Sequence, residues 1–379
     1  MDLQYRFANH MAELYERLAD ALSKKMFLAR VAFDTSYSID SMLQLWGLSG
    51  VLTEDEAAEQ LNWRRAFDNL NRNKQKIILY GAGCCGRLVG KALLQNHSDF
   101  FGYCDRNAAD FQDGLLGKPV IPPRYLFEHA NECYVILATM DYPLEIYHYL
   151  LTNHFPEDHI LPYFGKPGAS YDSLIASMYF EFPELYPKGK AFVDGGCFHC
   201  ETSARFAEWC SGAYSKIIAF EPDQENYQYC QKLLAEHPVE RLELLRAGLS
   251  DHAGTAVFAE SDYSGSCIME AESDRANLME SVLTQKNVYE IKTVALDDVV
   301  KDCEVGFIKL DIEGAEYAAL QGAKQTLLRD KPFLAICVYH RRGDLLAIMD
   351  YLHGLIPEYR FWLRHYSFVG CDTVLYASV

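Results

Sequence analysis

Acidic residues beside glycines, at the ends of apolar segments, are the residues in this sequence best suited to chemistry. Asp194-Gly195-Gly196 ends one such segment, and Glu221 ends another 27 residues later. A glycine loop with an acid, followed by an acid at the end of the next strand, is typical of sites that hold a nucleoside by its ribose. The leading acid and the missing third glycine favour S-adenosylmethionine over NAD. A glycine turn with two unrelated acids is the alternative.

A second acidic cluster, KLDIEGAE (309–316), also follows an apolar segment. In open α/β sheets, chemistry lies beyond the carboxyl ends of the strands, so we expect Asp311 and Glu313 to be functional. The alternative is that these acids only stabilise the N-terminus of the following helix, and this explanation fits Glu316 well. His340 follows a further apolar segment and could take a proton from an attacking hydroxyl. A packing or helix-capping role for His340 is equally open.

A third pattern is Gly81-x-Gly83-x-x-Gly86, with Asp105 at the end of the next predicted strand. Such glycines let the backbone approach a pyrophosphate, and the acid would take the ribose diol of a nucleotide or dinucleotide. The alternative is a tight turn that packs a helix on a strand without any ligand.

Cysteines form two local patterns. Cys197-Phe198-His199-Cys200 suggests zinc or redox work, but no second pair completes four ligands. We therefore assign no metal and expect packing in a loop there, and likewise for Cys84-Cys85. The twelve scattered cysteines are expected to be reduced thiols of a cytosolic protein.

Two series of alternating strands and helices must position these residues. They predict an α/β protein with two Rossmann-like doubly wound sheets. The division is a helical segment over 1–70, a nucleotide-binding domain over 71–168, and a second domain over 186–379 that ends in an antiparallel hairpin. The expected strands cover residues 76–80, 100–104, 133–138, 160–163, 191–193, 216–220, 242–247, 306–310, 333–338, 359–363 and 373–376.

Charge and hydropathy exclude several classes of protein. The formal net charge of −18 argues against nucleic acid as the main partner and against docking on an anionic membrane. No apolar run approaches the roughly 20 residues that cross a bilayer. The N-terminal MDLQYRFANH lacks the features of a signal peptide, which predicts a cytoplasmic location.

The second domain resembles a known family. FVDGGCFHCETS (192–203), IIAFEPDQENY (217–227), AGLSD (247–251), FIKLDIEGAEYAALQGA (307–323) and VYHRRGDL (338–345) resemble FkbM-family S-adenosylmethionine-dependent methyltransferases. The resemblance covers about residues 188–379. It implies a class I methyltransferase fold, with a seven-stranded sheet whose last strand is reversed.

The resemblance also implies O-methyl transfer to a hydroxyl of a sugar, glycan or natural product. Asp194 and Gly196, with Gly195 between them, would form the loop on the methionine side, and Glu221 would hold the ribose hydroxyls. Ser250 and Asp251 would lie near the adenine. Asp311 and Glu313 would lie at the methyl-transfer face, where we add His340 to orient or deprotonate the acceptor. Cys200 stands where the family usually has glycine, and a thiol there is expected to crowd the cofactor loop unless the loop shifts.

The first domain, from KIILYGAGCCGRLVG (76–90) onward, resembles nucleotide-binding domains in front of some sugar-nucleotide-modifying enzymes. It lacks an evident Ser/Tyr-x-x-x-Lys arrangement, so we expect it to bind or position a ligand. Two other functions stay open. One is a nucleotide-sugar oxidoreductase or epimerase that uses the glycine-rich loop, and the other is a non-catalytic ligand-binding protein. The expected partner is a small molecule or glycan, and a homo-oligomer is left open.

Overall fold

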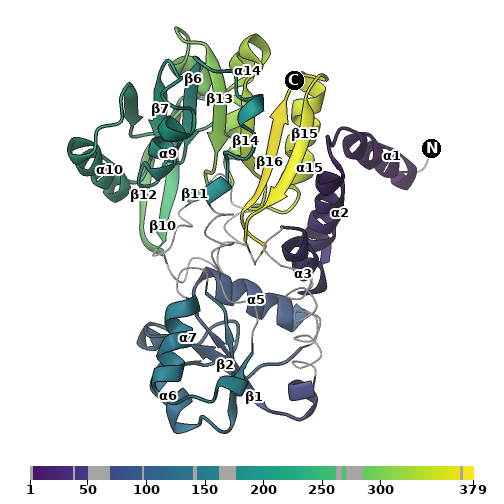
Figure 1. Ribbon diagram of the computed structural model, residues 1–379, viewed down its shortest axis with the longest axis vertical. Coiled ribbons are helices and arrows are strands. Elements are labelled where there is room, and N and C mark those ends of the chain that lie inside the picture. Colours follow the sequence, from purple (N-terminus) through teal and green to yellow (C-terminus); the bar gives the residue numbers. More distant parts are fainter. Residues whose placement is uncertain are drawn as a thin grey trace. The chain divides into compact units, whose positions relative to one another are not determined.

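The computed structural model describes residues 3–36, 39–49, 69–95, 98–139, 143–161, 176–261, 267–269, 285–367 and 370–379 (Figure 1). The chain divides into two compact units. The seven-stranded unit comprises Met1–Phe27, Ser177–Arg364 and Asp372–Val379. The five-stranded unit comprises Leu28–Ala176 and His365–Cys371.

The seven-stranded unit takes its name from its main sheet. In spatial order the strands are β15 (Arg360–His365), β16 (Thr373–Ser378), β14 (Phe333–Cys337), β13 (Val305–Leu310), β6 (Ala191–Gly195), β7 (Ile217–Phe220) and β8 (Leu242–Leu245). From β14 to β8 all neighbours are parallel, whereas β16 pairs antiparallel with β14. The strands predicted within 191–376 are confirmed, and so is the reversed last strand.

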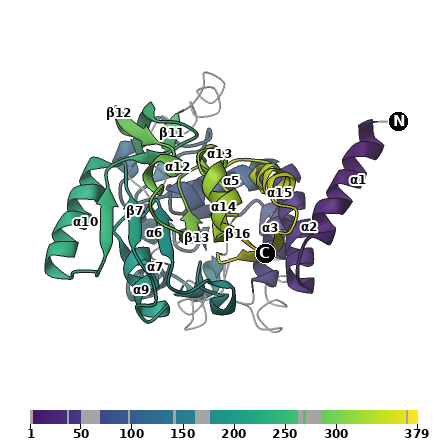
Figure 2. The same cartoon turned by 90° about the horizontal axis from the view of Figure 1, so that it is seen from above.

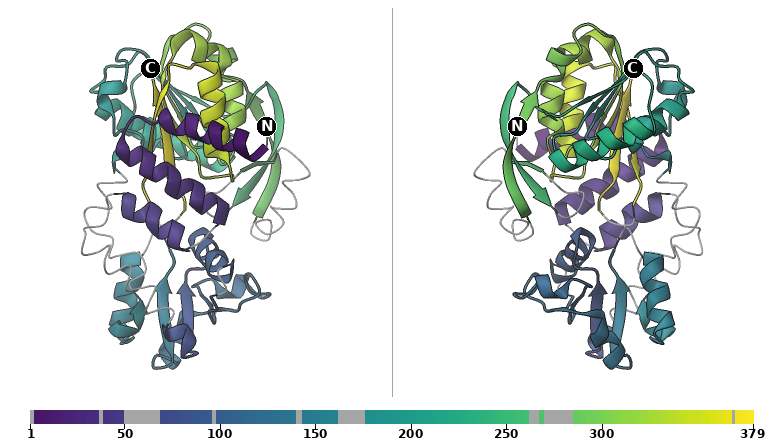
Figure 3. Two further views of the ribbon diagram at one scale, coloured as in Figure 1. Left: turned by 90° about the vertical axis from the view of Figure 1, so that its right-hand side faces the viewer. Right: turned by 90° about the vertical axis from the view of Figure 1, so that its left-hand side faces the viewer.

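Helices cover both faces of this sheet, which is why its central strands read as continuous apolar runs. The helices are α9 (Glu201–Trp209), α10 (Gln224–Glu236), α12 (Leu296–Val299), α13 (Glu316–Gln321), α14 (Lys324–Asp330) and α15 (Asp344–Leu355), with a 3₁₀ turn η3 (Pro183–Leu185) before them. Figures 2 and 3 show α9 on one face and α13, α14 and α15 on the other. The core under α9 is aromatic, with Phe192 stacked on Phe206 at 4.1 Å between ring centroids.

A smaller sheet in the same unit was not predicted. Its order is β11 (Cys267–Met269), β10 (Gly254–Ser261), β12 (Gln285–Val294) and β9 (Gly248–Leu249). Strands β10 and β12 form a long antiparallel pair, visible side by side in Figure 1. Helix α15 is likewise an element that the sequence analysis does not anticipate.

Residues 1–70 are divided between the two units, with the division falling inside α2 (Ala21–Ser36). The part up to Phe27, including α1 (Leu3–Glu16), belongs to the seven-stranded unit. The Ala19 backbone N–H donates to the Phe361 carbonyl at 2.7 Å, which joins the segment to β15. Helix α3 (Ile39–Leu48) follows in the five-stranded unit. Within the helical segment predicted over 1–70, residues 50–68 lie outside the described residues.

The five-stranded unit contains one parallel sheet. Its order is β3 (Val120–Ile121), β2 (Gly102–Cys104), β1 (Lys76–Tyr80), β4 (Cys133–Leu137) and β5 (Ile160–Leu161). Besides α3, the unit contains α5 (Cys84–Gln95), α6 (Pro123–Glu128) and α7 (Pro143–Thr152), with the 3₁₀ turns η1 (Ala108–Asp110) and η2 (Glu157–His159). The four strands predicted here are confirmed, and the two-residue strand β3 was missed. Among the helices described in either unit, none is long and apolar enough to cross a membrane.

Candidate active site

Lys309 and Asp194 form a buried ion pair between the adjacent strands β13 and β6. Lys309 Nζ lies 3.1 Å from Asp194 Oδ1, and Ser203 Oγ donates to Asp194 Oδ2 at 2.7 Å. Burial alone would lower the pKa of Lys309, but the Asp194 carboxylate beside it raises that pKa to about 12. Asp194 is completely buried, so it holds the following loop in place and offers no exposed atom to a ligand.

The glycine loop is fixed by the same lysine. Lys309 Nζ donates to the Gly195 carbonyl at 3.0 Å and to the Gly196 carbonyl at 2.6 Å. Gly196 has a φ of +74°, and a Cβ there would lie 1.9 Å from the Asp311 carbonyl oxygen. Only glycine fits this position, because the turn after β6 packs directly against the end of β13.

Glu221 lies at the carboxyl end of β7 and is almost fully buried. Its Oε2 accepts from the Phe198 backbone N–H and its Oε1 from the Asp223 backbone N–H, each at 2.9 Å. Burial raises the pKa of the carboxyl group to about 7. A carboxylate has about four acceptor positions, so two remain for a further donor pair such as two vicinal hydroxyls.

Ser250 and Asp251 follow β9, the short strand that the sequence analysis missed. Ser250 is buried, and its Oγ donates to Asp251 Oδ1 at 3.1 Å. Asp251 is about half exposed and lies 2.6 Å from His252 Nδ1, a hydrogen bond that lowers the pKa of Asp251. Asp251 is therefore an exposed acceptor, while Ser250 serves to orient it.

Asp311, at the end of β13, accepts hydrogen bonds from two tyrosines. Tyr179 Oη donates to its Oδ2 at 2.7 Å, and Tyr339 Oη to its Oδ1 at 3.3 Å. Although burial raises the pKa of Asp311, the charges of Lys309 and His340 hold it below its usual value. Asp311 is an ionised anchor with about a quarter of its side chain exposed. Sequence reasoning missed Tyr179, which precedes Asp311 by 132 residues and lies in the predicted domain boundary.

His340 lies within ion-pair distance of three carboxylates. Its Nδ1 is 2.9 Å from Glu316 Oε1, and its Nε2 is 3.3 Å from Glu313 Oε2 and 3.5 Å from Asp311 Oδ1. Burial would lower the pKa of His340, but Glu316 and Glu313 raise it to about 10. The imidazole is thus a cation at neutral pH, which argues against the base role expected for it. It is instead suited to hold the carboxylates in place.

Glu313 differs from its two acidic neighbours. It has a left-handed φ of +57° in the turn between β13 and α13, and more than a quarter of its side chain is exposed. A non-glycine residue in that region is strained, and such strain gathers at functional sites. The three residues predicted for the methyl-transfer face, Asp311, Glu313 and His340, are therefore brought together here.

In the five-stranded unit, Asp105 closes the glycine-rich loop. Its Oδ2 accepts from the Ala82 backbone N–H at 2.9 Å. A Cβ on Gly86 would lie 1.9 Å from the Gly81 carbonyl oxygen, and Gly81 has a φ of +117°. The fourth residue of the predicted site, Gly83, directly precedes α5. This geometry explains the glycines by tight packing of the turn, and a nucleotide in this loop stays a prediction.

Residues 195–369 match the family model of the methyltransferase FkbM domain. No curated protein matches the chain. A solved methyltransferase FkbM from Methylobacillus flagellatus KT is 20% identical, with 84% of this chain and 99% of that chain covered and a TM-score of 0.49.

Two further solved structures are less similar. An rRNA methylase from Streptococcus thermophilus is 17% identical, covers 55% of this chain and 92% of its own, and has a TM-score of 0.32. Fibrillarin of Aeropyrum pernix with natively bound S-adenosyl-L-methionine is 10% identical, with coverages of 54% and 74% and a TM-score of 0.33.

Proposed function

We propose that this chain, which carries a methyltransferase FkbM domain over residues 195–369, transfers a methyl group from S-adenosylmethionine to a hydroxyl of a sugar, glycan or natural product. The observation that carries the proposal is the buried Glu221 carboxylate. It is joined to the glycine loop through the Phe198 backbone N–H at 2.9 Å, at the carboxyl edge of the sheet. That edge is where ligands bind in open α/β sheets.

The residues present fit an adenosyl cofactor. Glu221 keeps two acceptor positions for the ribose hydroxyls, and Asp251 is an exposed acceptor for the adenine side. The loop around Gly195 and Gly196 would face the methionine end, with Asp194 as a positioning residue behind it. When bound, S-adenosylmethionine supplies an electrophilic methyl group on a sulfonium.

The protein must align an acceptor hydroxyl and remove its proton. Asp311 is tied to two tyrosines, so we give it the role of orienting the hydroxyl. Glu313 is strained and partly exposed, and it takes the proton. His340 fixes the Glu313 carboxylate by its positive charge, at 3.3 Å. Alignment of this kind supplies several kcal/mol of barrier lowering, and general-base catalysis adds roughly 10²–10⁴-fold.

For the five-stranded unit we propose binding of a nucleotide or dinucleotide, without redox chemistry. Its parallel strand order, β3-β2-β1-β4-β5, matches the first five strands of the doubly wound Rossmann order, and the loop from Gly81 to Gly86 lies after the central strand β1. Fluorescence titration with an adenine nucleotide and with a sugar nucleotide tests this, since saturable binding abolished by Gly83→Asp is expected. A flat titration with both ligands would reject it.

Mass spectrometry tests the proposed reaction. The protein is incubated with S-adenosylmethionine and a panel of sugars, glycans and hydroxylated natural products. The expected result is an acceptor heavier by one methylene and an equal amount of S-adenosylhomocysteine. Glu313→Gln should lower the rate by about 10²-fold or more, whereas Glu304→Gln, at an exposed carboxylate that pairs with Lys190, should not. Methylation on nitrogen or carbon alone would contradict the proposed acceptor class.

A further inference from the structure

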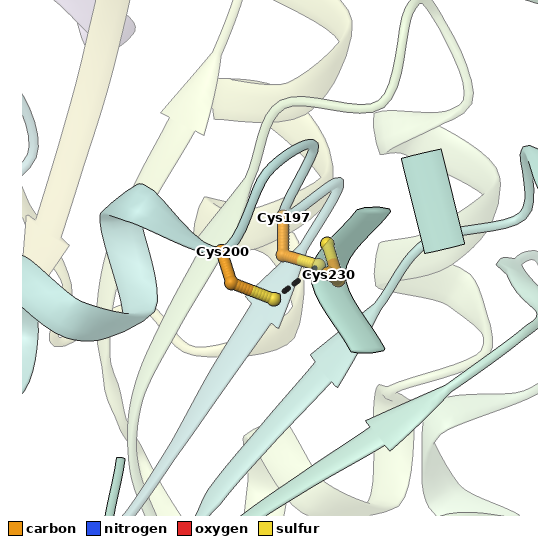
Figure 4. A group of neighbouring side chains, drawn as sticks. All are labelled: Cys197, Cys200 and Cys230. Atoms are coloured by element: carbon orange, nitrogen blue, oxygen red, sulfur yellow. Dashed lines mark hydrogen bonds between the residues drawn. The ribbon is translucent and has the colours of Figure 1, made fainter. Parts of the chain in front are cut away.

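Three cysteines meet beneath the glycine loop of the seven-stranded unit. Cys197 and Cys200 flank the loop before α9, and Cys230 comes from α10, 30 residues further along the chain (Figure 4). All three side chains are buried, and their sulfur atoms all lie within 4.8 Å of one another. The sequence analysis left Cys197 and Cys200 without further ligands because it did not place Cys230 beside them.

From this geometry we propose that Cys197, Cys200 and Cys230 bind one thiophilic metal ion, Zn²⁺, which holds the cofactor loop in place. The inference does not depend on the proposed methyl transfer, because the three cysteines lie together whatever reaction the site performs.

The spacing of the sulfur atoms suits zinc. Zn–S bonds of about 2.3 Å in a tetrahedron separate two sulfurs by about 3.8 Å. Cys197 Sγ and Cys200 Sγ are 3.7 Å apart, which is too long for a disulfide. Soft thiolates select zinc over the hard cations magnesium and calcium. Three sulfurs leave the fourth tetrahedral position to a water molecule. The Cys230 thiol donates to the Phe198 carbonyl at 2.8 Å, and this hydrogen bond would be lost when the thiol gives up its proton to bind the ion.

The backbone at Cys200 argues against simple apolar packing. Cys200 has a φ of +61°, a left-handed conformation that is strained for a residue other than glycine. Glycine would relieve that strain, so the thiol stands here at a local cost in backbone conformation. The thiol points into the cluster with Cys197 and Cys230, away from solvent (Figure 4). The expected crowding of the cofactor loop by Cys200 is avoided because the side chain enters this core.

The metal would act on the cofactor site through one residue. Phe198 lies between the two loop cysteines, and its backbone N–H donates to Glu221 Oε2 at 2.9 Å. An ion bound to both Cys197 and Cys200 would therefore fix the Phe198 backbone N–H, which orients the Glu221 carboxylate. Loss of the ion is expected to loosen this loop and to lower the thermal stability of the protein.

Metal content tests the proposal directly. The full chain is purified under reducing conditions, loaded with Zn²⁺ or Co²⁺, dialysed, and analysed by plasma mass spectrometry and absorbance. We expect close to one ion per chain and a thiolate-to-cobalt charge-transfer band in the near ultraviolet. Cys230→Ser and Cys200→Gly should each bring both signals to background. Because glycine readily adopts the left-handed conformation at this position, Cys200→Gly keeps the local backbone geometry while it removes one ligand.

The matched control is Cys210→Ser, at a buried cysteine outside the cluster whose thiol contacts the Ala207 carbonyl. It should retain the metal and the cobalt band. A wild-type chain that binds neither ion with all thiols reduced would overturn the proposal, and so would equal metal retention in Cys230→Ser and wild type. Neither outcome bears on methyl transfer, which is measured separately by product formation.

Discussion

Lys309 Nζ and Asp194 Oδ1 lie 3.1 Å apart, and both side chains are almost completely removed from solvent. This pair ties β13 to β6 at the edge where the glycine loop begins. The lysine also donates to the carbonyls of Gly195 and Gly196, so one side chain fixes the loop and neutralises its buried acid. The ion pair thus holds the loop from within the protein core, and neither side chain is exposed to a ligand.

Removing the lysine should strongly destabilise the seven-stranded unit. Lys309→Met leaves the Asp194 carboxylate buried without a counter-charge, which typically costs about 3–5 kcal/mol. Urea unfolding followed by tryptophan fluorescence measures the loss. Lys301→Met is the control, because Lys301 pairs with Asp298 at the exposed surface and should change stability little. Equal effects of the two substitutions would show that the buried pair does not stabilise the fold.

A pair of glycines separates backbone strain from close packing. Gly196 and Gly212 have nearly equal φ values, +74° and +72°, but only Gly196 has no room for a Cβ. Gly212→Ala should cost roughly 1–2 kcal/mol for the left-handed conformation alone. Gly196→Ala should cost about 1–3 kcal/mol more, because its Cβ meets the Asp311 carbonyl. If the free energies of unfolding fall equally in urea titrations, the loop does not pack on β13 as described.

His340 should make stability fall at alkaline pH. Its pKa is raised from 6.5 to about 10 by Glu316 and Glu313, with Asp311 and Asp344 also nearby. A raised pKa stabilises the fold fully below pH 6.5, and this contribution is lost as the pH rises through about 10. The difference in unfolding free energy between wild type and His340→Gln should therefore shrink from pH 6.5 to 10. A difference that is constant over that range would mean that His340 is neutral in the folded protein.

Glu221 should make cofactor binding depend on pH in the opposite direction. Burial raises its pKa to about 7, and only the ionised carboxylate accepts hydrogen bonds from both ribose hydroxyls. The dissociation constant for S-adenosylhomocysteine should rise about tenfold for each pH unit below 7. Glu221→Gln should bind weakly with little dependence on pH between 5 and 8. The same slope in both proteins would place the titrating group elsewhere.

Strand positions could be predicted because central parallel strands are continuous apolar runs. Segments such as Lys76–Tyr80 and Phe333–Cys337 are recognisable from composition alone. The strands β9 and β11 are only two and three residues long, and neither carries a readable period. Acidic residues that follow predicted strands could be named as candidate site residues, because the carboxyl ends of parallel strands meet at one edge of the sheet.

Contacts between distant segments could not be predicted from spacing. A turn at residues 177–180 brings Tyr179 next to Asp311 at the end of β13, and nothing in the local sequence indicates this contact. Cys230 joins Cys197 only once α10 packs on the sheet. The charge state of His340 also depends on three carboxylates, of which Glu316 had been assigned to a helix N-terminus. The sequence identifies His340 as a candidate, but it does not show whether the surroundings raise or lower the pKa of its imidazole.

Calorimetric titration of the full chain with S-adenosylhomocysteine tests the central claim most directly. The account predicts saturable one-site binding in the micromolar range at pH 8, weakened about 10-fold or more by Glu221→Ala, because two charge-assisted hydrogen bonds are lost. Glu243→Ala, at a partly exposed acid on β8, should bind like wild type. No heat of binding at millimolar ligand, or equal affinity in wild type and Glu221→Ala, would contradict the assignment of this edge as the cofactor site.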